Sequence, residues 1–109
     1  MRPPEPKDEA DRPLADVDRV VHEPARLTIL MYLSSVESAD FVFLMRVAGL
    51  TWGNLSSHLS KLEEVGYVEI EKTFLRKKPH TVIRLSKRGR RALRDYRQTM
   101  QRTLDQLGH

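Results

Sequence analysis

The chain of 109 residues contains no cysteine. It therefore has no disulfide, no thiolate ligand for a metal and no thiol redox switch. No apolar run approaches the roughly 20 residues that a membrane-spanning helix needs. Residues 1–7 are not followed by the apolar segment of a secretory signal. We therefore expect a cytoplasmic protein of one domain, with no membrane partner.

Patterns of catalysis and metal binding are also missing from the sequence. It has no glycine-rich phosphate loop, no serine elbow and no pair of carboxylates at a useful spacing. The histidines have no metal-ligand spacing, and they are His22, His58, His80 and His109. A histidine–carboxylate metal site remains an unsupported alternative. We expect a protein that is not an enzyme, with no cofactor and no metal, and the sequence identifies no small-molecule effector.

Positive charge is concentrated in the C-terminal half of the chain. The net charge is +4, but residues 71–102 hold twelve Lys and Arg against two acidic residues, whereas residues 1–20 hold four against six. A surface that serves only solubility usually intersperses both signs. The asymmetry indicates a polyanionic partner.

Residues 50–65 have the pattern of an amphipathic helix. Thr51 is a suitable N-cap, and Gly66 is a suitable end. The apolar stripe comprises Leu55, Leu59, Leu62 and Val65. The opposite face carries short polar groups near its N-terminal end and a lysine further along, and comprises Gly53, Asn54, Ser57, Ser60, Lys61 and Glu64. Such a face fits the major groove of DNA, although an ordinary solvated helix rich in serine has the same pattern.

The N-terminal residues divide into a tail and a short apolar segment. Residues 1–13 contain four prolines and alternating charges, so we expect a disordered tail, and a domain over residues 14–109. The next apolar residues recur at helical spacing. They predict a short helix that packs on the body or on a second subunit, and are Leu14, Val17, Val20 and Val21.

Two further helices are predicted before Thr51. Pro24 suits a first helical position, because the N–H that proline lacks would have no partner there. Asp40 suits the N-cap of a helix over residues 41–48, and Gly49 suits its end. The predicted inner stripe of that helix is Phe41, Leu44 and Val47. A helix, a short glycine turn and a second helix are typical of a helix-turn-helix.

A hairpin is predicted after the amphipathic helix. Residues 67–74 and 81–85 alternate between apolar and polar side chains, which indicates two strands. The connecting residues 75–80 are basic and include a proline. They are too many for a two-residue turn, so we expect a longer loop with a mobile tip.

Residues 86–107 predict a long last helix, with Ser86 as its N-cap. Its apolar side chains recur as a heptad-like seam that suits pairing with another helix. The helix would be about 32 Å long, more than a domain of this size needs to cover its own core. We expect a homodimer whose interface comprises Leu14, Val17, Val21, Leu93, Tyr96, Met100, Leu104 and Leu107.

Three phrases of the sequence resemble one protein family. They are His-Glu-Pro-Ala-Arg-Leu-Thr-Ile-Leu at 22–30, Gly-Leu-Thr-Trp-Gly-Asn-Leu-Ser-Ser-His-Leu-Ser-Lys-Leu-Glu-Glu-Val-Gly-Tyr-Val at 49–68, and Arg-Leu-Ser-Lys-Arg-Gly-Arg at 84–90. They resemble the ArsR/MarR-like winged helix DNA-binding domain of prokaryotic transcriptional regulators. The resemblance covers roughly residues 14–100 and implies a mainly α (α+β) fold, a winged helix-turn-helix with a two-stranded wing and a long C-terminal dimerisation helix.

The resemblance also implies a site on double-stranded DNA, a pseudo-palindromic operator bound by a dimer. The recognition helix would contact the major groove through Thr51, Trp52, Gly53, Asn54, Ser57, His58 and Lys61. The wing would contact flanking phosphates or the minor groove through Arg76, Lys77, Lys78 and His80.

Two features depart from the family pattern. Trp52 replaces a small polar residue at the start of the recognition helix, and its indole either covers a sugar-phosphate strand or packs back on the turn. Its large area favours packing. The helix over residues 41–48 also carries apolar side chains outside its inner stripe. These side chains are Val42, Phe43 and Met45. Residues 14–21, which we call the first segment, would cover them, or a second subunit or an effector pocket would.

The function expected from these patterns is sequence-specific binding of double-stranded DNA by a dimeric repressor that occludes a promoter. The alternative is a winged helix that binds another protein, because folds are often reused for different partners. That alternative predicts a poorly basic recognition face and wing.

Overall fold

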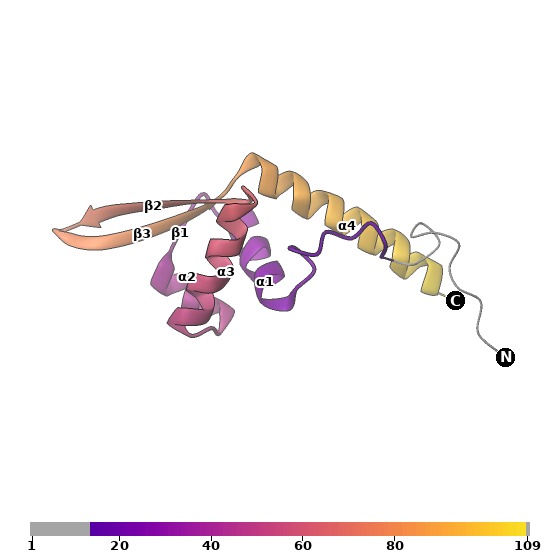
Figure 1. Cartoon of the computed structure of the whole chain (residues 1–109), viewed down its shortest axis with the longest axis horizontal. Helices are drawn as coiled ribbons and strands as arrows, with labels where there is room; N and C mark the ends of the chain where they lie inside the picture. Colours follow the sequence, from indigo (N-terminus) through magenta and orange to yellow (C-terminus); the bar gives the residue numbers. More distant parts are fainter. Residues whose placement is uncertain (1–13, 109) are drawn as a thin grey trace.

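The computed structural model describes residues 14–108 (Figure 1). The predicted tail, residues 1–13, and the terminal His109 lie outside the described residues. Four helices and three strands follow one another as α1 (Pro24–Ser34), β1 (Ala39–Asp40), α2 (Phe41–Ala48), α3 (Trp52–Glu64), β2 (Val68–Leu75), β3 (Lys78–Leu85) and α4 (Lys87–Leu107). This is the predicted winged helix fold, mainly α with a β wing.

Local hydrogen bonds set the start of each helix. Pro24 opens α1, and the carboxylate of Glu23 before it accepts from the backbone N–H groups of Ala25 and Arg26 at 3.1 and 2.7 Å. The side chains of Asp40 and Ser86 do the same for α2 and α4, at 2.9 Å each. These side chains satisfy N–H groups that have no partner inside the helix.

The three strands form one antiparallel sheet in the order β1-β3-β2. Strand β1 is only two residues long, and Ala39 pairs with Ile83. Strands β2 and β3 pair along their whole length, from Val68 opposite Leu85 to Leu75 opposite Lys78. This hairpin is the wing, and its tip projects beyond the helices (Figure 1).

The predicted long loop over residues 75–80 is wrong. The strands extend to Leu75 and from Lys78, so only Arg76 and Lys77 form the turn. Both have left-handed backbones, with φ of 53° and 65°. Such a turn matches the twist of the strands, which favours continued pairing. A left-handed backbone costs a residue other than glycine about 1–2 kcal/mol.

The predicted helix over Leu14, Val17, Val20 and Val21 is also wrong, because this segment forms turns. Leu14 has a left-handed backbone with φ of 67°. The carboxylate of Asp18 accepts from the N–H groups of Val20 and Val21 at 2.9 and 3.2 Å. An aspartate that bonds nearby backbone groups competes with helical hydrogen bonds.

One hydrophobic core joins the helices to the base of the wing. It comprises Val21, Ile29, Leu30, Leu33, Ala39, Phe41, Leu44, Leu55, Leu59, Leu62, Val68 and Ile83. Val47, predicted in the inner stripe of α2, is instead 39% exposed. Helix α2 has only eight residues, so Phe41 and Leu44 fill the space beside β3 and Val47 lies past the edge of the core.

Helix α4 joins the body at a close backbone approach. A Cβ at Gly89 would overlap the carbonyl oxygen of Tyr67, so only glycine fits there. The hydroxyl of Ser86 donates to the carbonyl of Gly66 at 2.6 Å. The C-terminal half of α4 extends away from the body, beside the segment that precedes α1 (Figure 1). Among the described helices, none is long and apolar enough to cross a membrane.

Candidate DNA interface

The position of helix α3 is set by the turn that separates it from α2, by its N-cap and by its buried inner face. Gly49 takes the left-handed conformation that ends α2, with φ of 67°. The hydroxyl of Thr51 then accepts from the N–H of Asn54 at 3.2 Å. The inner face of α3 carries three buried leucines, which are Leu55, Leu59 and Leu62. The predicted amphipathic helix is therefore present, and its leucines fix which face packs on the core.

The outer face of α3 carries short polar side chains near its N-terminal end, with Lys61 and Glu64 further along, as predicted. All six predicted outer residues are exposed, and they are Gly53, Asn54, Ser57, Ser60, Lys61 and Glu64. No atom outside the helix lies within 4 Å of a Cβ built on Gly53. This face is open to a large partner, and its first turns carry no long side chain that would hold a surface away.

Trp52 combines the two expected arrangements. Its ring packs on Phe41, with the ring centroids 4.4 Å apart and tilted by 47°. Yet 60% of Trp52 remains exposed, whereas Phe41 is 9% exposed. The indole therefore packs back on α2 with one part and presents the rest beside the outer face of α3.

His58 does not lie on the outer face. It is partly buried, and its Nδ1 atom lies 3.4 Å from Nη1 of Arg26 and 3.7 Å from the carboxylate of Glu23. Burial opposes ionisation of Glu23, but hydrogen bonds from the backbone of Arg26 and Ala25 hold its pKa below the usual value. His58 therefore joins α3 to the start of α1, and its placement argues against a contact with bases.

The wing separates its charges along its length. Near the base, Arg84 donates to Glu71 at 2.7 Å, so these two charges offset one another. At the tip, Arg76, Lys77 and Lys78 are all exposed, whereas His80 is partly buried. The predicted basic hairpin is present, and among the residues that the structure describes its unpaired positive charge is concentrated at Arg76, Lys77 and Lys78.

The tip also carries apolar side chains that the sequence analysis did not assign to the interface. Phe74 is 73% exposed and Leu75 is 56% exposed. Their signal in the sequence is a break in the alternation of β2, since two neighbouring apolar residues cannot both face one core. The prediction placed Phe74 at the end of a strand and Leu75 in a loop. An exposed apolar residue in such a place does not by itself indicate a binding surface.

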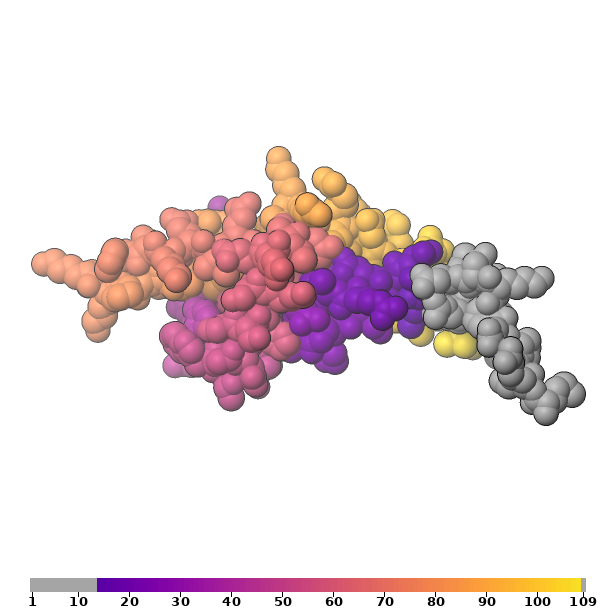
Figure 2. Space-filling view, in the orientation of Figure 1, coloured from indigo at the N-terminus to yellow at the C-terminus, as the bar shows by residue number. Residues whose placement is uncertain are grey.

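Helix α3 and the wing flank one groove of about 630 Å³. Ser56 and Ser60 line it from α3, Lys72 and Thr81 line it from the wing, and Trp52 lies at its end. Both elements lie on the face of the molecule shown in Figure 2. One wall of this groove therefore belongs to α3 and the other to the middle of the wing, and its charged lining residues are Glu63 and Lys72.

The seam of α4 is partly covered by its own chain. Leu93, Tyr96 and Met100 are partly buried, whereas Leu104 and Leu107 are 54% and 74% exposed. A groove of about 690 Å³ runs between α4 and α1, with Leu27, Met31, Leu93, Met100 and Leu104 among the residues that line it.

Three residues of the first segment were also predicted at a dimer interface. Leu14 and Val17 are partly buried, so part of each remains accessible. Val21 has no exposed surface, because it lies inside the core of its own chain. Val21 is therefore unavailable to a second subunit, and its place in the predicted interface is wrong.

The apolar outer face of α2 stays uncovered. Val42 and Phe43 are 37% and 47% exposed, and Met45 is partly buried. Phe43 meets Tyr32 edge-on, with the ring centroids 5.6 Å apart. The first segment does not cover this face, which excludes one of the three expected arrangements.

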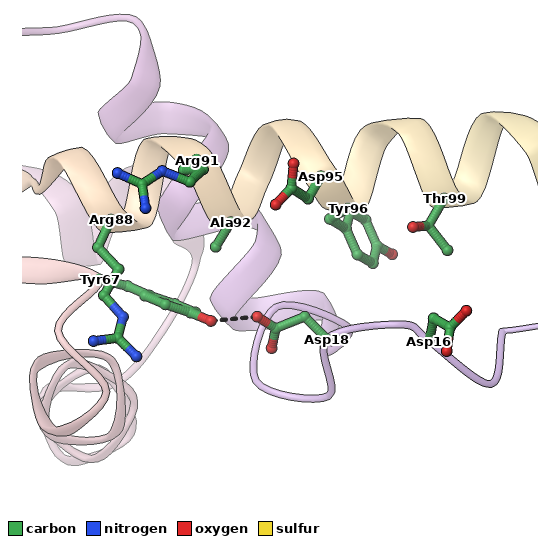
Figure 3. Close-up of a pocket in the computed structure, with 9 residues that line it drawn as sticks. All are labelled: Asp16, Asp18, Tyr67, Arg88, Arg91, Ala92, Asp95, Tyr96 and Thr99. Carbon is green, nitrogen blue, oxygen red and sulfur yellow. Dashed lines mark hydrogen bonds between the residues drawn. The ribbon is translucent and has the colours of Figure 1, made fainter.

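A second, polar cavity of about 330 Å³ lies between the first segment and α4 (Figure 3). Tyr67 donates a hydrogen bond from its hydroxyl to Asp18 across it. Burial and this neighbouring carboxylate raise the pKa of Tyr67 to about 12. Arg88, Arg91 and Asp95 line the side formed by α4.

The fold and the joined surface of helix and wing define a winged helix protein of the DNA-binding class. Residues 25–104 match the winged helix DNA-binding domain family, and the chain belongs to that family. The resemblance inferred from the sequence is thereby confirmed, and the family and fold are those of transcriptional regulators.

Relatives match over most of the chain. An uncharacterized protein of Methanocaldococcus jannaschii is 36% identical over 78 residues, which cover 72% of this chain and 85% of that protein. The structure of a transcriptional regulator homologue from Pyrococcus horikoshii is 29% identical, covers 83% of this chain and 89% of its own, and has a TM-score of 0.77. A transcriptional repressor, CouR, bound to a 23-mer DNA duplex has the same fold, with a TM-score of 0.69 at 22% identity over 86% of this chain and 66% of its own.

Proposed function

We propose that this chain represses transcription as a homodimer that occludes a promoter by binding a pseudo-palindromic operator. The observation that carries the proposal is the shared groove between α3 and the wing, lined by Ser60 and Glu63 of α3 and by Lys72 of the wing. A duplex that receives the outer face of α3 in its major groove would bring the neighbouring backbone and minor groove to the wing. The structure of CouR bound to a DNA duplex supports binding of duplex DNA by a protein of this fold.

The cations of the wing supply affinity that does not depend on sequence. Arg76, Lys77 and Lys78 are exposed at its tip. Cations that neutralise phosphates release condensed counterions, so binding weakens as salt rises. The process is binding alone, with no covalent step.

The outer face of α3 supplies discrimination between bases. Asn54, Ser57 and Lys61 are exposed on consecutive turns. In the major groove asparagine pairs with adenine, lysine pairs with guanine, and serine accepts either role. Thr51 and Gly53 open the helix, where backbone and hydroxyl groups come nearest to a phosphate strand.

A twofold pair would form through the seam of α4. Leu104 and Leu107 are exposed far from the core, and the groove between α1 and α4 lies beside them. Burial of these side chains against a second copy would remove apolar surface from water. Two recognition helices would then read half-sites about one DNA turn, or about 34–36 Å, apart.

An electrophoretic mobility shift with random genomic duplex tests the proposal most directly. The expected result is a shifted complex at low salt whose affinity falls steeply between about 50 and 200 mM salt. Absence of a complex at low salt would favour the alternative, a winged helix module that binds protein. Selection from a random-sequence duplex library then supplies the preferred site.

A further inference from the structure

The tip of the wing is apolar as well as cationic. Phe74 and Leu75 are 73% and 56% exposed, and Pro79 is exposed beside them. Single exposed apolar side chains are ordinary on a protein surface. Here three gather at the end of a hairpin that no helix covers (Figures 1 and 2).

The strand register puts these side chains on both faces of the tip. Phe74 pairs with Pro79, and Leu75 pairs with Lys78. Paired residues share a face, and neighbours along a strand face opposite sides. One face therefore presents Phe74 with Pro79, and the other presents Leu75 with Lys78.

The turn keeps the tip narrow at the expense of backbone strain. Arg76 and Lys77 both have positive φ, where Asn-Gly is the usual choice. The tip is therefore only two strands wide, which is about 4.7–4.9 Å between backbones. Two cations stand where asparagine and glycine would relax the turn, and this strained backbone points to a function for their charge.

We propose that the tip of the wing enters the minor groove beside the recognition-helix site, inserts Phe74 between base pairs, lays Leu75 on its other face against the groove, and bends the duplex there. Arg76, Lys77 and Lys78 would hold the phosphates on either side of the inserted ring. Minor-groove proteins use apolar side chains as wedges in this way, and the wedge partly unstacks one base step. The inference rests on the proposed function, because it requires a bound duplex.

A wedge also selects sequence without contacting base edges. Pyrimidine–purine steps unstack easily, whereas A-tracts are stiff. The preferred site should therefore carry a pyrimidine–purine step at the position of each wing. Charge alone would not create this preference, since phosphates are alike at every step.

Fluorescence energy transfer between dyes on the two ends of a duplex measures the bend. The probe is a duplex that the wild-type chain selects from a random-sequence library. The wild-type chain should shorten the distance between the ends. The double variant Phe74→Ala/Leu75→Ala should bind about tenfold more weakly and leave the duplex straight. The single variant Phe74→Trp should bend the duplex as the wild-type chain does, because it keeps an aromatic ring at this position.

Two variants serve as controls. Lys77→Ala should weaken binding yet keep the bend in the complex that forms, because it removes charge and leaves the ring. Phe43→Ala removes an exposed aromatic from α2, away from the wing, and should change neither affinity nor bend. Exchange of the pyrimidine–purine step in the duplex for an A-tract should lower the affinity of the wild-type chain. It should leave the affinity of the double variant almost unchanged.

The outcomes separate this inference from the proposed function. If the wild-type chain selects no duplex, both fail. If it selects one and the double variant bends it as strongly as the wild-type chain, only the wedge is overturned. If the free double variant instead forms a smaller oligomer than the wild-type chain and still bends the duplex, the tip contacts protein. The wedge is again overturned.

Discussion

The hydroxyl of Tyr67 donates a hydrogen bond to the carboxylate of Asp18 and thereby ties the segment before α1 to the base of the wing (Figure 3). The other oxygen of Asp18 accepts from the backbone of Val20 and Val21. Val21 is buried in the core, so this one carboxylate connects the first segment, the core and the wing.

Tyr67→Phe should lower the free energy of unfolding at neutral pH by about 1–2 kcal/mol, because it removes the side-chain donor to the second oxygen of Asp18. The pKa of Tyr67 is raised from 10 to about 12 in the folded chain. The contribution of the hydroxyl is therefore complete below pH 10, and is lost as the pH rises from 10 towards 12. Urea unfolding of both chains at several pH values measures the difference. A difference that stays constant up to pH 12 would contradict this account.

Gly89→Ala should destabilise the fold by about 1–3 kcal/mol or more, because the added methyl overlaps the backbone carbonyl of Tyr67. Gly53→Ala is the matched control, since its methyl would meet open space in α3. Alanine also suits a helix better than glycine by about 0.5–1 kcal/mol. Thermal unfolding should therefore show a lower Tm for Gly89→Ala and an equal or higher Tm for Gly53→Ala. Equal losses in both variants would disprove the close approach.

Asn54→Ala and Lys61→Ala should each weaken the selected site by about 1–3 kcal/mol, with a smaller effect on random duplex. Lys77→Ala should weaken all duplexes alike and reduce the salt slope by about one unit, because it contacts phosphate. Titrations of selected and random duplex at two salt concentrations measure both quantities. The division between helix and wing fails if all three variants lose affinity equally on both duplexes.

Leu104→Glu should convert the proposed dimer into a monomer, because it places a charge where apolar surface would be buried. Leu104 is 54% exposed in the single chain, so the substitution should leave the fold of each subunit intact. Gln98→Glu adds the same charge at an exposed position on the other side of α4 and should leave the dimer unchanged. Sedimentation equilibrium reports the mass. A wild-type chain that sediments as a monomer would refute dimerisation through the apolar seam of α4.

Much of this architecture follows from short-range patterns. Thr51, Gly49 and the leucine stripe of α3 act within one or two helical turns, so their roles were predicted from the sequence. The wing was only partly predicted. The sequence indicated the strands, but the choice between a long loop and a two-residue turn depends on pairing along the whole hairpin, and this pairing overcomes the poor turn preference of Arg76 and Lys77.

The site residues divide in the same way. The exposure of Asn54 and Lys61 follows from helical periodicity and the apolar stripe opposite them. The inward position of His58 depends on Glu23 and Arg26, which lie more than thirty residues earlier in the chain. The burial of Val21 likewise depends on the turn made by Asp18, which replaced the predicted helix.

The sequence by itself determined the four helices α1 to α4, the caps Asp40, Thr51 and Ser86, the apolar stripe of α3 and the concentration of positive charge, because these arise from neighbouring residues and from composition. Only the tertiary structure decided that α3 and the wing line one groove, that Phe74 and Leu75 are exposed at a narrow tip, and that Val21 belongs to the core. These properties depend on contacts between segments far apart in the chain, and such contacts have no local signature.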